Sequence, residues 1–217
     1  MRGAELRAYI AERLNDKSPG RIPAVRGDFD LMPHLRPPLP PGTPVRPAAV
    51  LIPLFEREDE LRVLFTRRAD HLANHAGQIS FPGGRVDPED PHPVETALRE
   101  AEEEVALDRR FVDVVGSLDP YVSGTGFSIT PVVGFLKHGF TVHPHEAEVA
   151  EIFDVPFDFL MDPENRQRHV KDYNGTQRHY YAMPYGRHYI WGATAGILVN
   201  LWERLYGTVP AGMVANR

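Results

Sequence analysis

The stretch that decides the fold of this 217-residue chain is residues 83–107, GGRVDPEDPHPVETALREAEEEVAL. Its second part, residues 94–107, is rich in Ala, Leu, Glu and Arg and contains neither Gly nor Pro, which predicts a helix. Helical positions i, i+3 and i+4 share a face, so the carboxylates of Glu100, Glu103 and Glu104 are expected to converge. Like charges on one face repel unless a cation lies among them, and Mg²⁺ and Mn²⁺ prefer carboxylate oxygens. The spacing indicates a metal site, and a solvated acidic face is the alternative.

The four residues Phe81-Pro82-Gly83-Gly84 come shortly before this helix and are expected to form a tight turn. Because glycine has no Cβ, backbone can approach a ligand or a metal closely there. The carbonyl oxygen of Gly83 or Gly84 is a candidate further ligand, since hard divalent cations take oxygen donors. A glycine turn followed by an acidic helix is the outline of a metal-assisted catalytic site.

The segment resembles the Nudix box, whose pattern is a glycine, five residues, Glu, seven residues and then Arg-Glu-apolar-x-Glu-Glu-x-Gly-apolar. Gly84 matches the leading glycine, Arg99 and Glu100 match the Arg-Glu pair, and Glu103 and Glu104 match the paired glutamates.

Three departures from the box are visible in this chain. The acid after the glycine is Asp90 rather than Glu, with Glu89 as a substitute for the same role, and the gap from Asp90 to Arg99 is one residue longer. Ala106 replaces the last glycine, which should cost roughly 1 kcal/mol if a left-handed helix end is kept.

Residues 64–84, LFTRRADHLANHAGQISFPGG, are similar to the signature that precedes the box in the coenzyme A pyrophosphatase branch of the family. Residues 190–195, IWGATA, are a further similarity to this branch. Ala73 stands where that signature usually has an Arg, a residue that could have met a nucleotide phosphate. This difference keeps other nucleoside diphosphate derivatives open as substrates.

The resemblance implies a Nudix-type α/β/α sandwich with a mixed sheet, preceded by an N-terminal helix and a Pro-rich extension. It also implies metal-dependent hydrolysis of coenzyme A or acyl-coenzyme A to 3′,5′-ADP and (acyl-)4′-phosphopantetheine. ADP-ribose and dinucleoside polyphosphates are the alternative substrates. A non-catalytic nucleotide-sensing module is the alternative from another class, but such modules usually lack a box glutamate.

The same resemblance assigns candidate roles to the site residues. Glu100, Glu103 and Glu104 would hold Mg²⁺ or Mn²⁺, which neutralises pyrophosphate oxygens and activates water. Arg99 would pair with one of these glutamates and fix its rotamer. Glu148 is the preferred general base within HEAEVAEIF, and Glu146 and Glu151 are the other candidates.

Substrate contacts are expected from the segment before the helix, at Arg67, Arg68, His75, Gly83 and Gly84. Arg67 and Arg68 point to opposite faces of a strand, so only one is expected to meet the 3′-phosphate of coenzyme A. His75 lies over a substrate phosphate or caps the loop.

The composition argues against several functional classes. The net charge of −6 does not suit nucleic-acid binding, although a bound cation still permits a phosphorylated substrate. The chain has no cysteine and no apolar run approaching the length of about 20 residues that a membrane span needs. Its N-terminus lacks the order of a signal peptide, so a cytoplasmic location is expected.

The remaining pattern predicts the organisation of the chain. Residues 1–45 form an N-terminal helix and a Pro-rich linker, residues 46–207 form the Nudix hydrolase domain, and residues 208–217 are a tail. The expected helices span residues 4–14, 157–161 and 193–206, and the segment 18–49 runs as an extended linker. The expected strands are 48–55, 61–67, 78–81, 112–118, 128–135, an acidic strand within 144–156 and a hairpin within 166–185 around Asn174-Gly175. The N-terminal helix and residues 180–191 would support a homodimer.

Overall fold

The computed structural model describes residues 3–15, 25–32, 44–73, 75–173 and 176–207. Its main element is a nine-stranded mixed sheet built around β2 (Arg46–Arg57). β2 pairs antiparallel with β3 (Glu60–Arg68) and parallel with β8 (Phe127–Leu136). The segment 48–55 is apolar on both faces of the strand, as expected for a central strand covered on both sides.

The turn between β2 and β3 explains the tight hairpin. Glu58 and Asp59 have φ values of 54° and 61°, the left-handed conformation that a two-residue hairpin turn of the primed type requires. The predicted hairpin over residues 48–67 is therefore confirmed.

The other strands of the main sheet surround this hairpin. β5 pairs with the start of β2, β6 and β7 pair with β8, β1 pairs with β7, and β4 and β9 pair with β3. Their bounds are Arg26–Gly27 (β1), Ile79–Ser80 (β4), Gly83–Arg85 (β5), Val112–Ser117 (β6), Tyr121–Val122 (β7) and Val149–Pro156 (β9). A second, three-stranded antiparallel sheet consists of β10 (Gln167–Tyr173), β11 (Thr176–Tyr185) and β12 (His188–Trp191).

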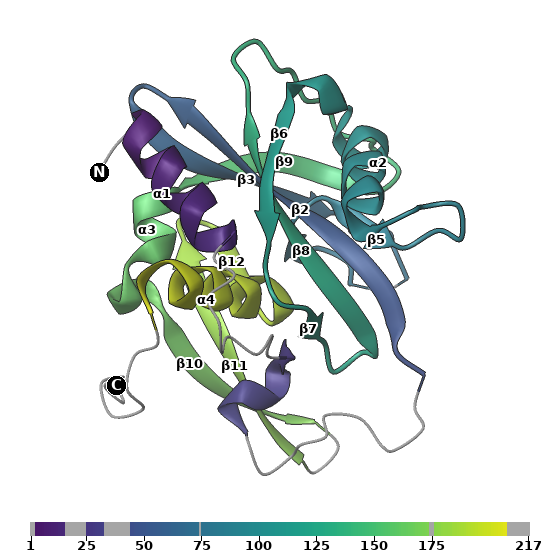
Figure 1. The fold of residues 1–217 in the computed structure, drawn as a ribbon. Helices are drawn as coiled ribbons and strands as arrows, with labels where there is room; N and C mark the ends of the chain where they lie inside the picture. Colours follow the sequence, from purple (N-terminus) through teal and green to yellow (C-terminus); the bar gives the residue numbers. More distant parts are fainter. Residues whose placement is uncertain (1–2, 16–24, 33–43, 74, 174–175, 208–217) are drawn as a thin grey trace.

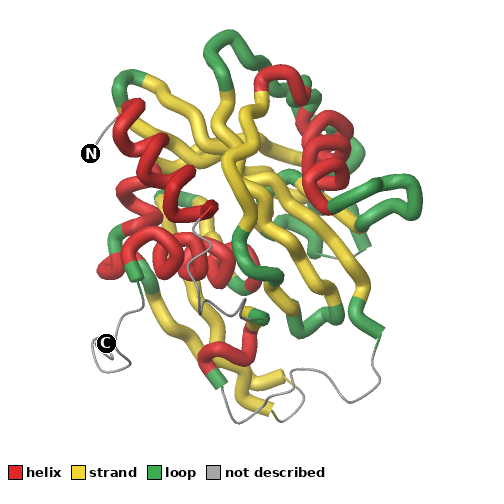
Figure 2. The backbone as a smooth tube through the Cα atoms, in the orientation of Figure 1, coloured by secondary structure: helices red, strands yellow, loops and turns green. Residues whose placement is uncertain are grey.

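Helices cover both faces of the main sheet (Figures 1 and 2). One apolar cluster joins α2 (Pro93–Val105) to one face through Ala97, Ala101 and Val105. A larger cluster joins the other face to the remaining helices, α1 (Gly3–Asn15), α3 (Phe157–Met161) and α4 (Ala193–Tyr206). This arrangement confirms the predicted α/β/α sandwich with a mixed sheet.

The N-terminal segment is part of the folded body. α1 buries Leu6, Ile10 and Leu14 in the larger cluster. Residues 26–31 differ from the expected extended linker, because they form β1 and a 3-10 turn (Asp28–Leu31). The Asp28 carboxylate anchors this turn by accepting hydrogen bonds from the Tyr121 hydroxyl at 2.7 Å and the Gly124 amide at 2.8 Å. The rest of the predicted linker in 18–24 and 33–43, the turn at 174–175 and the tail lie outside the described residues.

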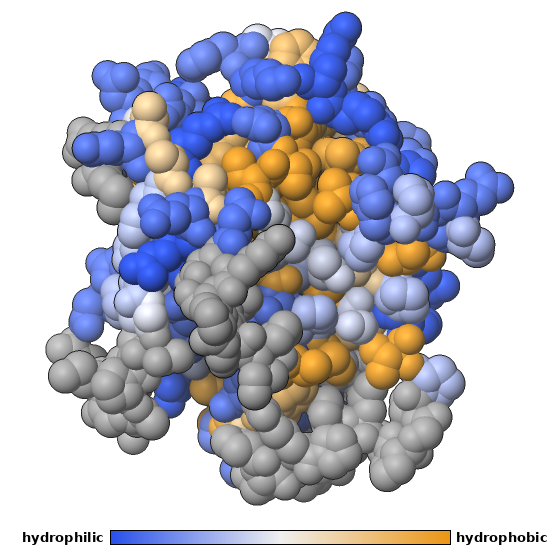
Figure 3. All heavy atoms as spheres, viewed as in Figure 1, coloured by the Kyte–Doolittle hydropathy of each residue, from blue (hydrophilic) through white to orange (hydrophobic). Residues whose placement is uncertain are grey.

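The surface view in Figure 3 shows apolar side chains gathered over β6, between α1 and α2. β6 pairs along one side with β8 and carries half-buried valines that pack into both apolar clusters. Within the described residues, no helix is both long enough and apolar enough to cross a membrane.

Candidate active site

The double glycine lies where no side chain has room. β5 pairs with β2, and a Cβ on Gly83 would lie 2.4 Å from the carbonyl oxygen of Ala49. A Cβ on Gly84 would lie 2.4 Å from the carboxylate of Glu100. Glycine is required at both positions because backbone and a carboxylate occupy the space that a side chain would need.

Glu104 is a buried carboxylate with only 5% of its surface exposed. It accepts a hydrogen bond from the Gly83 amide at 3.1 Å, and Arg68 Nη1 lies 3.9 Å from its Oε1. Burial raises the pKa of Glu104 to about 7; the Gly83 hydrogen bond and Arg68 oppose the rise, and Glu100 and Glu148 add to it. The neighbouring groups therefore do not fully compensate the negative charge of the Glu104 carboxylate.

Glu100, one turn earlier on α2, is a second carboxylate whose pKa is raised by burial. Burial raises its pKa, Arg99 opposes the rise, and the charges of Glu103 and Glu148 add to it. Glu148 is itself exposed, but its charge acts on both Glu100 and Glu104. The structure therefore brings the predicted general base to the same site as these two predicted metal ligands.

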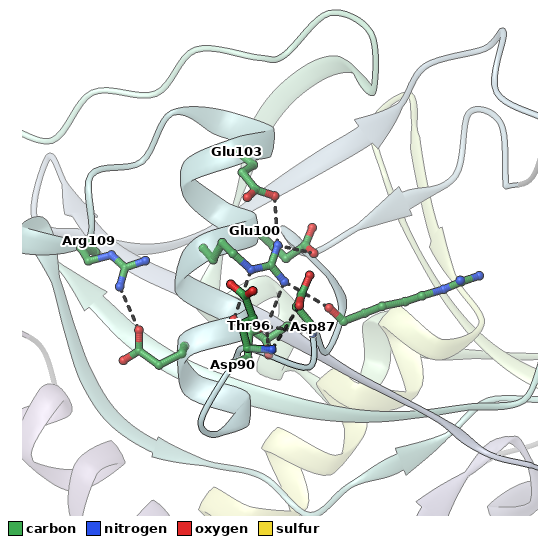
Figure 4. Close-up of polar contacts among 10 residues, drawn as sticks. Asp87, Asp90, Thr96, Glu100, Glu103 and Arg109 are labelled. Carbon is green, nitrogen blue, oxygen red and sulfur yellow. Dashed lines mark hydrogen bonds and ion pairs between the residues drawn. The ribbon is translucent and has the colours of Figure 1, made fainter.

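Arg99 connects the loop before α2 to the carboxylates on the helix (Figure 4). Its Nη1 donates to Glu100 Oε1 and to Glu103 Oε2, each at 3.0 Å. Its Nη2 donates to Asp90 Oδ2 at 3.0 Å. Arg99 therefore holds the orientation of one half-buried glutamate, Glu100, and one exposed glutamate, Glu103, at once.

Asp90, rather than Glu89, is the acid that meets this arginine. Its carboxylate also accepts from the Thr96 hydroxyl at 2.8 Å and from the Asp87 amide at 3.0 Å. The hydrogen bond from Arg99 holds the pKa of Asp90 well below its usual range. Asp90 thus ties the longer loop to the helix, although its side chain is shorter than Glu.

Glu103 lies at the edge of the site. Its side chain is 60% exposed and shares Arg99 Nη1 with Glu100, whose own side chain is 17% exposed. Glu102 points elsewhere and pairs with Arg109, which also bridges to Glu95. Helical spacing thus places Glu100 and Glu104 inward and leaves Glu103 at the rim.

The two neighbouring arginines at the end of β3 face opposite sides. Arg68 points to Glu104 on the α2 side, whereas Arg67 pairs with Asp70 at 2.6 Å and lies 3.7 Å from Glu151. His75 is exposed, and its Nδ1 lies 2.8 Å from Gln78 Oε1 within its own loop. Of these three predicted substrate contacts, Arg68 alone touches a carboxylate of α2 among the described contacts.

Of the other two candidate bases, Glu151 is on the far side of the sheet from α2. It accepts hydrogen bonds from Arg187 and from His188, the latter at 3.1 Å. Glu146 is exposed in the loop before β9. The structure therefore separates Glu151 from the carboxylates of α2.

The donors at the site suit a hard divalent cation. Glu100 and Glu104 supply oxygen atoms only, and burial without full charge compensation raises the pKa of each. Within the residues that the structure describes, no three acidic or histidine side chains form a ready metal cage. The fit therefore rests on Glu104, which is buried, and Glu100, which is half-buried, and we call these two carboxylates the buried pair. Glu103 and the glycine carbonyls are the further oxygen donors predicted from the sequence.

Thr96 is a supporting residue that the sequence analysis did not identify. Its hydroxyl donates to Asp90, the partner of Arg99. Arg99 Nη2 also donates to the carbonyl of Arg85 at 3.2 Å. The only available signal was a small hydroxyl residue in the first helical turn, where such side chains commonly bind nearby groups.

Ala106 ends α2 in the left-handed conformation, with φ 52° and ψ 30°. The Ala106 amide donates to the Glu102 carbonyl at 3.0 Å, the single bond that defines the αL type of helix end. We expect Ala106→Gly to raise the free energy of unfolding by about 1 kcal/mol, because glycine carries no Cβ penalty there. Urea unfolding measures this, with Ala8→Gly on the exposed face of α1 as a control that should destabilise. Equal destabilisation by both variants would contradict the role of this helix end.

The raised pKa of Glu104 predicts how the cation-free protein responds to pH. The folded chain holds a proton on Glu104 up to about pH 7, whereas the unfolded chain releases it near 4.5. Stability should therefore fall as pH rises through this window, by at most about 3 kcal/mol, and level off above it. Glu104→Gln should remove this part of the pH dependence in urea unfolding with a chelator present. Parallel pH profiles of the free energy of unfolding for the two proteins would contradict this prediction, because ionisation of Glu104 would then not destabilise the folded chain.

Comparison with known proteins identifies the family of the chain. The NUDIX domain family matches residues 45–173. The chain is 44% identical over 161 residues to an uncharacterized Nudix hydrolase NudL of Yersinia enterocolitica, covering 73% of this chain and 80% of that protein. It is 41% identical over 171 residues to the mitochondrial Nudix hydrolase 15 of Arabidopsis thaliana, covering 76% of this chain and 60% of the plant protein's length.

Among solved structures, a MutT/nudix family protein from Enterococcus faecalis has a TM-score of 0.48 at 13% identity, with 94% of this chain and 75% of that chain covered. The matched domain spans both the glycine turn and the acidic helix. On the family match and the two relatives, this chain belongs to the Nudix hydrolase family.

Proposed function

We propose that this Nudix hydrolase cleaves the pyrophosphate of coenzyme A or acyl-coenzyme A, giving 3′,5′-ADP and (acyl-)4′-phosphopantetheine. The observation that carries the hydrolytic part is the buried pair Glu100 and Glu104, held against Gly83 and Gly84. The substrate part is supported by the similarity of residues 64–84 to the coenzyme A branch. Within that segment, Arg68 ends β3 facing the buried pair.

Glu100 and Glu104 are the residues that would hold Mg²⁺ or Mn²⁺, with Glu103 at the rim. When bound, the cation supplies positive charge against the pyrophosphate oxygens and favours ionisation of water. Arg99 holds Glu100 and Glu103 in place from the side of the loop. The carboxylates that would bind the cation are thus already oriented before the substrate binds.

Glu148 is proposed as the general base. It is exposed to solvent, and its charge adds to the raised pKa of both Glu100 and Glu104, so a water molecule at these carboxylates would lie near it. Arg68 is proposed to contact an anionic group of the substrate, because Arg67 is already engaged by Asp70 and Glu151. The lack of cysteine is compatible with a cytoplasmic location, which is part of this proposal.

ADP-ribose and dinucleoside polyphosphates are the alternative substrates, kept open by Ala73 at the position where the coenzyme A signature usually has an Arg. A nucleotide-sensing module without catalysis is the alternative from a different class. The presence of Glu100, Glu103 and Glu104 together favours the enzyme, because each of these carboxylates carries part of the proposed cation site.

The test is product analysis by chromatography, with coenzyme A, ADP-ribose and diadenosine polyphosphates offered in parallel in Mg²⁺ or Mn²⁺. We expect 3′,5′-ADP from coenzyme A and a loss of about 100-fold or more in Glu104→Gln, since a ligand of the cation is removed. Glu102→Gln is the matched control, because Glu102 is on the same helix but pairs with Arg109.

The outcomes separate the parts of the proposal. Cleavage of ADP-ribose alone would keep the chemistry and overturn the substrate. Equal activity of Glu104→Gln and Glu102→Gln would overturn the role of the buried pair. The absence of any turnover by the wild-type protein would favour the nucleotide-sensing module.

A further inference from the structure

The strand pair β3–β9 carries a second ion-pair cluster, on the face of the sheet opposite α2. Arg67 and Glu151 are directly opposed across the two strands, with Arg67 Nε 3.7 Å from Glu151 Oε2. Glu151 also accepts from Arg187, in the turn before β12, and from His188, the first residue of β12. We call Arg67, Glu151, Arg187 and His188 the Glu151 cluster.

This cluster joins the main sheet to β12. The ring of His188 stacks on Phe153 of β9, with the ring centroids 3.6 Å apart and an angle of 6° between the planes. Phe153 stacks in turn on Phe65 of β3 at 5.6 Å. The side chain of Glu151 is 23% exposed, so its contacts are partly shielded from water and persist better than those of a fully exposed pair.

The pairing of β3 with β9 becomes irregular right beside the Glu151 cluster. Arg67 opposes Glu151, but the next residue, Arg68, opposes Val149, so Ala150 is left without a partner. An extra residue of this kind bends a strand and redirects the side chains beside it, and such bulges are common next to active sites. Arg68 lies opposite Val149 at this bulge, and Glu148 directly precedes Val149; both Arg68 and Glu148 are part of the proposed site.

Backbone hydrogen bonds connect this bulge to α2. The Ala69 amide donates to the Glu148 carbonyl at 2.9 Å, and the Glu148 amide donates to the His145 carbonyl at 2.8 Å. The His145 amide donates to the carbonyl of Glu104 at 2.9 Å. A continuous hydrogen-bonded path therefore runs from the end of β3 through residue 148 to α2.

We propose that Glu151 is a positioning residue of the hydrolase: by fixing Arg67 and β12, it holds the bulge that places Arg68 and Glu148 at the carboxylates of α2. Glu151 does not touch the reacting groups and acts through these two residues. The inference rests on the proposed hydrolytic site but not on which nucleotide that site cleaves.

The far end of β9 offers a matched control. Asp154 accepts from Arg57 and Arg62, its side chain is 17% exposed, and it lies on the same strand three residues from Glu151. Glu151→Gln and Asp154→Asn therefore each remove one charge from an ion-pair cluster of β9. A general loss of stability would affect the two variants alike.

The experiment compares both variants for kcat and KM per folded molecule, and for hydrogen exchange of the Ala69 amide. We expect Glu151→Gln to lower kcat/KM by about 10-fold or more, since small misplacement of catalytic groups is costly, with Asp154→Asn within 2-fold of wild type. The Ala69 amide should exchange faster only in Glu151→Gln.

The same kinetic constants and the same Ala69 exchange in both variants would overturn the inference. Loss of wild-type turnover on every nucleotide tested would instead count against the proposed function. In that case the Ala69 exchange still decides whether Glu151 holds the bulge.

Discussion

The close approach of α2 to the glycine turn is the constraint on which the rest of the site depends. β5 can pair with β2 only because Gly83 carries no side chain, and Glu100 can lie against the turn only because Gly84 carries none. This approach removes water from Glu104 and lets the Gly83 amide bind its carboxylate. The packing of the acidic helix α2 against the side-chain-free glycine backbone therefore buries carboxylates without fully compensating their negative charge.

Arginine side chains on two sides of α2 compensate the negative charge of Glu100 and Glu104 only in part. Arg99, which is itself paired with Asp90, lies on the outer side of the helix, and Arg68 lies 3.9 Å from Glu104 on the inner side. Burial still raises the pKa of both Glu100 and Glu104. A divalent cation is the group whose binding would relieve this cost, which joins the stability of the fold to the proposed chemistry.

Local sequence signals predicted the elements but not every residue within the site. The helix over 94–107 and the final helix over 193–206 follow from composition and periodicity, and the structure has them as α2 and α4. The segment 26–31 was missed because the prolines around it favour an extended linker, whereas the anchoring contacts of Asp28 come from residues 121 and 124, far away in sequence.

Residue spacing also could not separate Glu148 from Glu151, and only the family resemblance preferred Glu148. Both belong to one acidic segment, and their faces depend on the register and on the bulge of β9, which only the pairing with β3 determines. Likewise, Glu103 shares the helical spacing of Glu100 and Glu104. It stays at the rim because the buried face of α2 follows Ala97, Ala101 and Glu104. Tertiary packing thus selects among residues that the pattern makes equivalent.

The most direct test of the central claim is a titration of the protein with Mn²⁺, followed by electron paramagnetic resonance of the free ion. The buried pair against the glycine turn should bind Mn²⁺ in the wild-type protein, and Glu104→Gln should weaken this binding by about 10-fold or more because one ligand is lost. Glu102→Gln should bind as the wild type does. Equal affinity of Glu104→Gln and the wild type would show that the cation does not use the buried pair.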